Sequence, residues 1–559
     1  MEPAPEAMPE DALARGLRLL TVLCWLLIFV PALFSRGPWH VDDLRYVEVA
    51  RQMGEYGEFL VPHINGDVYG EKPPGYFIPV VLLHWVTGAD YLLSARLLSA
   101  LSVVATGLML VHLGKLLFGS RAIGWLGAAC FSTMLFVVDR GQRSLIDTFL
   151  LPLVTAGTVT LFRAGLARSW HARLGWGAAA SVALGWACVT KGPVGVAVPA
   201  LGALALGLVA RGRQGVSIAA LVTAPVLGGA LTLGWLMLAA QQAGDWYLDR
   251  MLFRQSAGRA VESFHHAEPF WFFLLVMPPV MLPALLFVPH ALRQAWQRRR
   301  EPAARGALGL LAWSAAVLVF FSAISGKRTG YVLPMFAPLG LAAAWGVLQP
   351  QASRWLAWPA RALAWVALAA APLLAAMGLL HELLPPDLGP PELAELRAAQ
   401  PGDAWPSFVL CGLLLGLVAW RGARASAAGQ PLGAVAAGLL AVALLSLGAH
   451  VTVVPAMDAS RSANTFGAEV ARQWNRDEPL VSLGPHKDGL DNYFTNRRRT
   501  EPLSREALAE RAAQPGALWV IALSQDWTRM PEAARAGFVL RAEADFNNKH
   551  WLLLHRPAP

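Results

Sequence analysis

Charged residues of both signs gather between two apolar segments near the N-terminus, in a stretch that reads HVDDLRYVEVARQM and, further on, GDVYGEKPPGYF. A charged side chain in the apolar part of a bilayer costs about 2.5–3.5 kcal/mol even on lenient scales, so such a cluster needs water, a partner or a ligand. Carboxylates can accept a proton, and cations can hold an anionic group. The stretch therefore predicts chemistry on an anionic substrate. The charged members that we single out are Asp42, Asp43, Arg45, Glu71 and Lys72.

The apolar pattern after Asp43 predicts an interfacial helix whose N-terminal end carries the two carboxylates. An aspartate just before a helix is more often a cap than a catalyst, but capping uses one acid and leaves Arg45, Glu71 and Lys72 unexplained. We therefore favour catalysis. The two prolines after Lys72 restrict the backbone and would aim Glu71 and Lys72 at one point, although a turn with a snorkelling lysine is the simpler interpretation.

Three other polar segments lie beside apolar runs. Asp147 follows two arginines directly before a run, and helix capping explains it as well as function does. The loop from Gln241 to Pro269 contains Arg259 and His266; an interfacial aromatic belt explains its tryptophans, and a hydrogen-bonded loop histidine is commoner than a metal ligand. A short segment from Ser325 leads to Tyr331, whose phenol would begin a helix and face the same aqueous pocket.

The composition defines the class of protein. Of 559 residues, 55% are hydrophobic and 15% are charged, and apolar runs recur to about residue 454. This predicts a polytopic helical membrane protein. The first run lacks a small-residue cleavage pattern after it, so we interpret it as a retained span. The apolar windows are Leu17–Phe34, Tyr76–Thr87, Leu97–Leu117, Ile123–Val138, Thr148–Phe162, Leu174–Val189, Val194–Val209, Ile218–Ala240, Phe270–Val288, Leu308–Ile324, Tyr331–Leu348, Leu363–Leu380, Phe408–Trp420 and Leu432–Val454.

The window at Tyr76 is too short to cross a bilayer and suits an interfacial or re-entrant helix, which leaves about 13 spans. With the N-terminus in the cytoplasm, most basic loops then lie inside, as the positive-inside rule requires. This orientation accounts for the net charge of +9 without a nucleic acid partner. Asp42 and Asp147 would share the outer face, where the remaining cations are candidates for holding an anionic head group. The four cysteines fall in separate apolar runs without metal-ligand spacing.

The periodicity changes near Pro455. Helix-like segments are expected at 462–475 and 504–513, and strand-like segments at 479–483, 517–523, 538–544 and 550–555. We therefore expect two domains, a membrane domain at 1–454 and a small soluble α/β domain at 455–559.

An ordered set of motifs runs through most of the membrane region. The motifs are Asp42-Asp43-Leu44-Arg45-Tyr46, Tyr69-Gly70-Glu71-Lys72-Pro73-Pro74, Asp147 before a span, Thr190-Lys191-Gly192, His266-x-x-Pro269-Phe270-Trp271 and Gly326-Lys327-x-x-x-Tyr331-x-Leu333-Pro334. Together they resemble the GT-C fold glycosyltransferases that use polyprenyl-phosphate sugars, in particular the lipid A aminoarabinose transferases and the protein O-mannosyltransferases. The chain departs from that pattern at Leu44, where a small polar residue is common, and at Tyr76, where an aromatic residue comes early.

The resemblance implies a role for each matching residue. Asp42 would be the leading catalytic carboxylate and Asp147 its companion. Glu71 and His266 would fall where the family can bind a divalent metal ion. The residues that would bind the substrate and its lipid phosphate are Asp43, Arg45, Lys72, Arg259 and Tyr331.

The resemblance also implies the reaction: transfer of a sugar from an undecaprenyl-phosphate donor to lipid A, another lipid or a protein, on the periplasmic face of the bacterial inner membrane. The sequence contains no G-x-G-x-x-G after a strand and no P-loop, so no nucleotide cofactor is expected. A polyprenyl-lipid transporter or flippase is the alternative of a different class. Such a protein would be expected to carry discontinuous helices and mid-span polar residues in corresponding halves, and the sequence has neither an inverted repeat nor mid-span charge.

Overall fold

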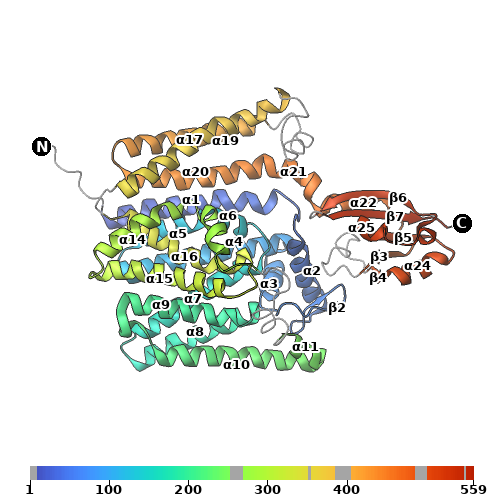
Figure 1. Ribbon diagram of the computed structural model, residues 1–559, viewed down its shortest axis with the longest axis horizontal. Coiled ribbons are helices and arrows are strands. Elements are labelled where there is room, and N and C mark those ends of the chain that lie inside the picture. Colours follow the sequence, from blue (N-terminus) through green and yellow to red (C-terminus); the bar gives the residue numbers. More distant parts are fainter. Residues whose placement is uncertain are drawn as a thin grey trace.

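Most of the chain forms a bundle of long helices, and a small sheet lies at one end of it (Figure 1). The computed structural model describes residues 9–251, 268–349, 354–383, 405–484, 500–546 and 549–558. Within these ranges, ten helices are long and apolar enough to cross a membrane. They are α1 (Glu10–Phe34), α4 (Tyr91–Phe118), α7 (Ile146–Leu166), α9 (Val194–Arg211) with η1 (Gly212–Gly215), α10 (Ile218–Ala243), α15 (Pro302–Ala323), η4 (Thr329–Met335) with α16 (Phe336–Val347), α17 (Arg354–Leu383), α19 (Trp405–Ala427) and α20 (Pro431–Val451).

Two predicted spans are broken, not continuous. The window at Ile123–Val138 forms α5 (Arg121–Ser132) and α6 (Leu135–Gly141), which meet at 74°. The window at Phe270–Val288 forms α13 (Phe272–Val280), η3 (Ala284–Phe287) and the start of α14 (Val288–Gln297), with a bend of 100°. Paired prolines in α13 remove backbone donors, which explains an interruption there.

The count of 13 spans is therefore not confirmed. Counting each bent pair as one span gives at most 12 in the described residues. The remaining predicted window coincides with α8 (Trp170–Lys191), whose 22 residues are long enough to cross but fall outside the apolar set. α8 nevertheless packs between α7 and α10.

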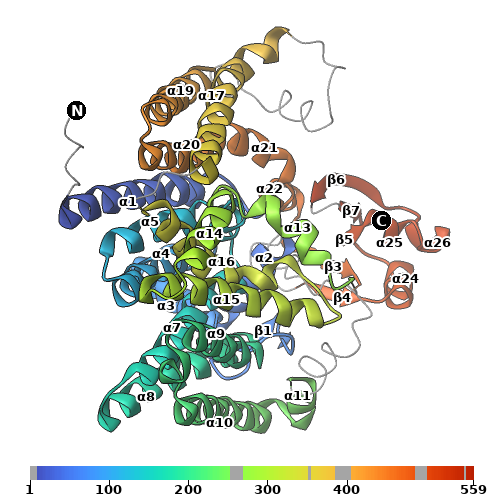
Figure 2. The same cartoon turned by 60° about the vertical axis from the view of Figure 1, so that its left-hand side comes forward.

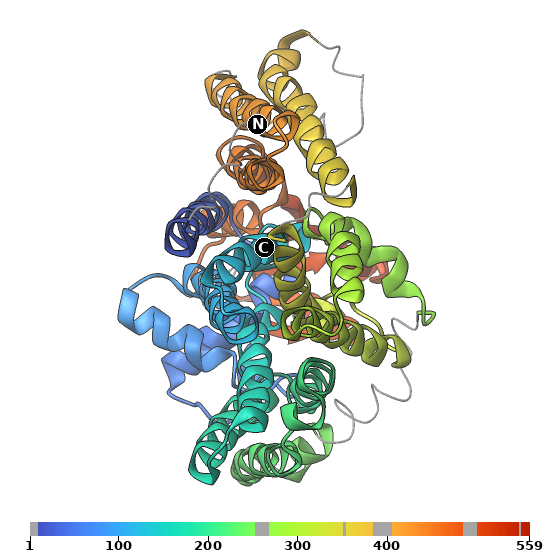
Figure 3. The same cartoon turned by 90° about the vertical axis from the view of Figure 1, so that its left-hand side faces the viewer.

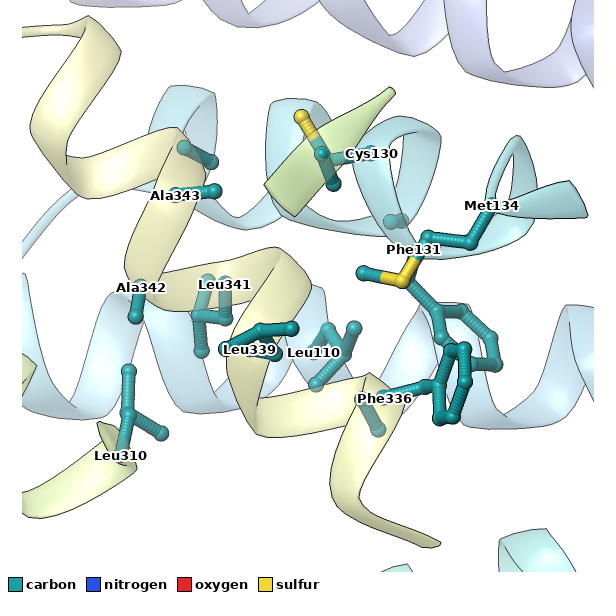
Figure 4. Close-up of a cluster of buried hydrophobic side chains, with 14 of the residues drawn as sticks. Leu110, Cys130, Phe131, Met134, Leu310, Phe336, Leu339, Leu341, Ala342 and Ala343 are labelled. Carbon is teal, nitrogen blue, oxygen red and sulfur yellow. The ribbon is translucent and has the colours of Figure 1, made fainter. Parts of the chain in front are cut away.

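The cross-section of the bundle is elongated. α17 and α19 lie at one edge and α8 and α10 at the other, as Figures 2 and 3 show from the side and along the helices. The centre packs α5 against α16, where Phe131, Phe336 and Leu341 are buried (Figure 4). Gly340 permits this close approach, because a methyl group there would meet the Phe131 backbone at 2.9–3.0 Å.

Short elements cover the end of the bundle that faces the sheet. They are α2 (Val41–Tyr56), the antiparallel pair β1 (His63–Ile64) and β2 (Asp67–Val68), and α3 (Phe77–Thr87). The apolar side of α2 is buried with Val80 and Val81 of α3. A helix at Asp43 and a short helix at Tyr76 are thus both present, and their interfacial position stays a prediction.

The C-terminal part forms a five-stranded sheet in the order β4-β3-β5-β7-β6. β3 (Leu480–Leu483) is parallel to β4 (Glu501–Leu503) and β5 (Leu518–Leu523), while β7 (Lys549–Arg556) is antiparallel to β5 and β6 (Val539–Phe546). The accompanying helices are α21 (Val453–Arg461), α22 (Ala463–Gln473), α24 (Arg505–Ala513), α25 (Ser524–Trp527) and α26 (Glu532–Arg535). Every helix and strand expected here is present, and β4 and three short helices are additional.

Candidate active site

The two N-terminal carboxylates lie within the first turn of α2, not before it. The N-cap is His40, and its side chain makes no capping hydrogen bond. Negative side chains in a first turn are stabilised by the partial positive charge of the helix N-terminus. Side-chain capping therefore does not account for Asp42 or Asp43.

Asp42, Arg45 and Glu71 form one half-buried ionic cluster. Arg45 Nη1 lies 3.8 Å from Asp42 Oδ1 and 3.5 Å from Glu71 Oε2. The three side chains are 37%, 23% and 29% exposed for Asp42, Arg45 and Glu71 respectively, so all of them reach solvent. Burial and the nearby Glu71 carboxylate raise the pKa of Tyr69, which keeps its phenol protonated beside the cluster.

Asp43 points the other way, into the protein. It is fully buried, and its Oδ1 accepts a hydrogen bond of 3.1 Å from the Ser144 backbone N–H, while no donor from the described residues reaches its Oδ2. Ser144 lies two residues before the start of α7, so this bond ties the start of α2 to the segment that carries Asp147. Arg140, in the same segment, lies within electrostatic range of both Asp42 and Asp43.

Asp147 lies in the first turn of α7 and pairs with Lys191 at the end of α8. The ammonium group of Lys191 also lies 4.6 Å from the centre of the Tyr331 ring, a cation–π contact. Gly330 completes the enclosure, because a methyl group on it would lie 3.0 Å from Asp147 Oδ2. Three segments that are far apart in the sequence thus meet around one carboxylate.

The turn after Glu71 joins the two clusters. The Gly75 N–H donates a hydrogen bond of 3.1 Å to the Val189 carbonyl, and the Trp186 indole donates one of 3.1 Å to the Gly75 carbonyl. Gly75 is thereby held against the residues that directly precede Lys191. Lys72 lies half-buried within this turn. The structure therefore brings Asp42, Asp43, Arg45, Glu71, Lys72, Asp147 and Tyr331 to the same end of the bundle.

Two predicted site residues, Arg259 and His266, lie outside the described residues. The Glu71 carboxylate faces Arg45, and nowhere in the described ranges do three or more histidine, cysteine, aspartate or glutamate side chains gather as a metal would require. The donors in the described ranges do not fit a metal site, and the Glu71–His266 pair stays a prediction.

Lys191 was expected only as one of the outer cations that could hold an anionic head group, and the sequence did not predict its pairing with Asp147. It occurs in a quoted motif and opposes the positive-inside rule, which was the available signal. Arg140 has the same signal. The pairing of Lys191 with Asp147, 44 positions earlier, requires the packing of α7 on α8.

The fold and the clustered charges define a multi-span membrane protein with a charged site beside a small mixed sheet. Comparison with solved structures makes the fold specific. ArnT from Cupriavidus metallidurans bound to undecaprenyl phosphate superimposes with a TM-score of 0.75 at 18% identity, over 97% of this chain and 98% of that one. The same enzyme in its apo state gives a TM-score of 0.74 at 19% identity. The chain therefore has the GT-C fold of that transferase.

Sequence comparisons agree with the fold. Residues 16–243 match the dolichyl-phosphate-mannose-protein mannosyltransferase family model. A curated relative from Sodalis glossinidius, undecaprenyl phosphate-alpha-4-amino-4-deoxy-L-arabinose arabinosyl transferase 2, is 32% identical over 59% of each chain. The corresponding transferase of Pectobacterium carotovorum is 31% identical over 58% of each chain. The chain thus spans about three fifths of the length of these relatives and, among GT-C proteins, resembles the aminoarabinose transferases.

Proposed function

We propose that this protein is a membrane glycosyltransferase that moves a sugar from an undecaprenyl-phosphate donor to an envelope acceptor, lipid A or another lipid. The observation that carries the proposal is the meeting of Asp42, Arg45, Asp147 and Lys191 at one end of a GT-C fold. Carboxylates next to cations are what transfer from a sugar phosphate requires: a proton acceptor for the nucleophile and positive charge for the leaving group.

In the proposed reaction, an acceptor oxygen attacks the anomeric carbon of the sugar. The new carbon–oxygen bond forms as the bond to the donor phosphate breaks, and the polyprenyl phosphate leaves with the bonding electrons. Asp42 is the most exposed of the three ionic partners in its cluster and takes or directs the proton of the nucleophile. Inversion at the anomeric carbon is expected for this single displacement.

The cations around Asp42 are assigned to the phosphate. Arg45 lies one helical turn from Asp42, and its guanidinium can donate two hydrogen bonds to a phosphate. Lys72 on the adjoining turn is assigned to the same phosphate, as is the phenol of Tyr331 beside Lys191. Arg259 is added to these residues from the resemblance. We assign Asp147 to holding Lys191 and Asp43 to holding the Ser144 segment.

The proposed location is the inner membrane, with the N-terminus in the cytoplasm and the site and C-terminal domain in the periplasm. Membrane lipids and the lipid-linked donor would then meet the site from the same leaflet. A protein acceptor is the second candidate, because the matched family model is that of a protein mannosyltransferase. A flippase is a weaker alternative: the two bent helix pairs supply discontinuous helices, but their breaks contain no charged residue.

Lipid analysis with a variant series tests the proposal. Envelope lipids and glycoproteins are analysed by mass spectrometry from cells with the gene, without it, and complemented with Asp42→Asn. Loss of proton transfer at Asp42 is expected to lower product by about 10²–10⁴-fold. Asp67→Asn, on the exposed surface of β2, is the matched control and should restore product fully.

Each outcome has a clear meaning. A sugar-modified lipid that depends on Asp42 supports the proposed transferase, and a modified protein instead of a lipid identifies the second candidate. Wild-type product from Asp42→Asn removes Asp42 from the mechanism. Lipid relocation without a new glycosidic bond would favour the flippase.

A further inference from the structure

The loop between α1 and α2 is bound by the C-terminal part of the chain. Asp458 of α21 accepts two hydrogen bonds through one oxygen, from the Gly37 N–H at 2.7 Å and from the Trp39 indole at 2.6 Å. The Ala463 N–H, at the start of α22, donates a further bond of 3.1 Å to the Pro38 carbonyl. Hydrogen bonds to an ionised acceptor are about twice as strong as neutral ones. Residues more than 400 positions later thus fix the three residues that lead toward Asp42.

The opposite side of the same loop is held by the membrane bundle. Arg96, buried in α4, donates hydrogen bonds to the carbonyls of Arg36 at 2.6 Å and Gly37 at 2.7 Å. The loop therefore lies between a cation from the bundle and a carboxylate from α21. Its position depends on both.

A side chain of α2 also enters the core of the C-terminal domain. Leu44 is 1% exposed and packs in one apolar cluster with Phe466, Trp519 and Leu553. A polar residue at this position would lose that burial, which gives a physical reason for a leucine where a small polar residue is common in the resembling family. Leu44 lies between Asp43 and Arg45, so this contact holds the turn that carries the ionic cluster.

From these contacts we propose that the C-terminal domain positions the catalytic end of α2, with Asp458 as its main positioning residue. The inference rests on the proposed function of Asp42. Asp458 acts through Gly37 and Trp39, by fixing the direction in which α2 leaves the loop. A misplacement of about 1 Å in a reacting group costs on the order of 10²-fold in rate, so a carboxylate far from the chemistry becomes necessary for it.

The test compares two substitutions at Asp458 in the full-length protein. Asp458→Ala removes the acceptor, whereas Asp458→Asn keeps one oxygen that can accept both hydrogen bonds. Glu469→Ala is the matched control, because Glu469 lies on α22 and pairs with Arg472 on the same exposed surface. Two readouts are taken: hydrogen–deuterium exchange of the segment 37–45, and kcat and KM for the polyprenyl-phosphate sugar donor.

We expect faster exchange of the segment 37–45 in Asp458→Ala, with kcat lowered about 10–100-fold and KM nearly unchanged. Asp458→Asn should recover most of both values, and Glu469→Ala should match the wild type. Unchanged exchange and kcat in a folded Asp458→Ala variant would overturn the inference. If that variant does not fold, Trp39→Phe decides the matter, since it deletes one of the two donors and keeps an aromatic ring; wild-type exchange and kcat would then reject the coupling.

The two readouts separate this inference from the proposed function. Faster exchange in Asp458→Ala, together with no transfer by the wild type from any polyprenyl-phosphate sugar, would retain the structural coupling and reject the glycosyltransferase. Normal transfer by the wild type, with unchanged exchange and kcat in Asp458→Ala, would retain the glycosyltransferase and reject the structural coupling.

Discussion

Asp42 and Asp147 have different surroundings and are therefore suited to different work. Asp42 is 37% exposed, and its Oδ1 lies 3.8 Å from Arg45 Nη1. Asp147 is 26% exposed and pairs directly with Lys191, which is 13% exposed. A carboxylate held by an ammonium group is a poor proton acceptor, because protonation would break the pair. These surroundings support the roles proposed above, proton transfer for Asp42 and the placement of a cation for Asp147.

The pairing of Asp147 with Lys191 can be measured by a double-mutant cycle. Asp147→Asn and Lys191→Met should each lower the melting temperature, and the double variant should lower it by less than the sum. A coupling of about 0.5–3 kcal/mol is expected for a direct, partly buried pair. The exposed pair of Glu469 and Arg472 is the control and should show a coupling near zero. Additive effects at Asp147 and Lys191 would contradict the pairing.

His40 gives the start of α2 a dependence on pH. Burial lowers its pKa below the ordinary value, and the nearby Arg143 lowers it further, against the opposing effect of Asp43. As pH falls below about 6.5, the unfolded chain therefore takes up a proton before the folded one, and stability decreases. Between roughly pH 7.5 and 5.5, the melting temperature of the wild type should fall more steeply than that of His40→Asn. Parallel curves would show that His40 is not the group responsible.

The helices illustrate what periodicity can and cannot predict. The apolar windows located the long helices, and the shortness of the Tyr76 window identified α3, because length and hydropathy are local properties. The breaks at α5–α6 and α13–α14 were missed, because the hydropathy of an apolar run is the same whether its helix is straight or bent. In the C-terminal domain, β4 was missed since it consists of only Glu501–Leu503 and pairs through β3.

The contact between the Glu71 turn and α8 depends on a glycine. A methyl group on Gly75 would lie 2.7 Å from both the Val189 carbonyl oxygen and Thr190 Oγ1. Gly75→Ala should therefore push the turn from α8, destabilise the protein by about 1–3 kcal/mol and lower transfer. Gly175→Ala is the control, because Gly175 lies in α8 and no atom lies within 4 Å of the added methyl group. This substitution should leave the stability of the protein unchanged or increase it. Equal melting temperatures and rates for the two variants would refute the contact.

At the scale of the molecule, the site is built from parts that the sequence separates widely. The motifs predicted that Asp42, Glu71 and Asp147 share one face, and their contacts place them at one end of the bundle. What could not be predicted is how they are held there. Asp458 and the apolar core around Leu44 belong to the C-terminal domain, and the sequence pattern of that domain does not indicate a contact with α2. Such contacts follow from the packed fold alone.

The proposed orientation can be tested with introduced cysteines. The four native cysteines are buried and should react little with a membrane-impermeant maleimide. In intact spheroplasts, Glu543→Cys on the exposed surface of β6 should be labelled, and Arg213→Cys, between α9 and α10, should be labelled only after permeabilisation. The reverse pattern would invert the topology and place the site in the cytoplasm.

α3 has a consequence for where a lipid substrate would enter. At 1.5 Å per residue its 11 residues extend roughly 17 Å, about half of a hydrocarbon core. Its inner side packs on α2 and α4, while Leu82, Trp85 and Val86 are 48%, 55% and 82% exposed. A helix of this length with one apolar exposed side is suited to lie within a single leaflet. Because α3 packs on α2, it would hold the Asp42 carboxylate at the depth of the glycerol and phosphate groups of the surrounding lipids. A lipid-linked donor could then reach the site laterally, by diffusion within its own monolayer.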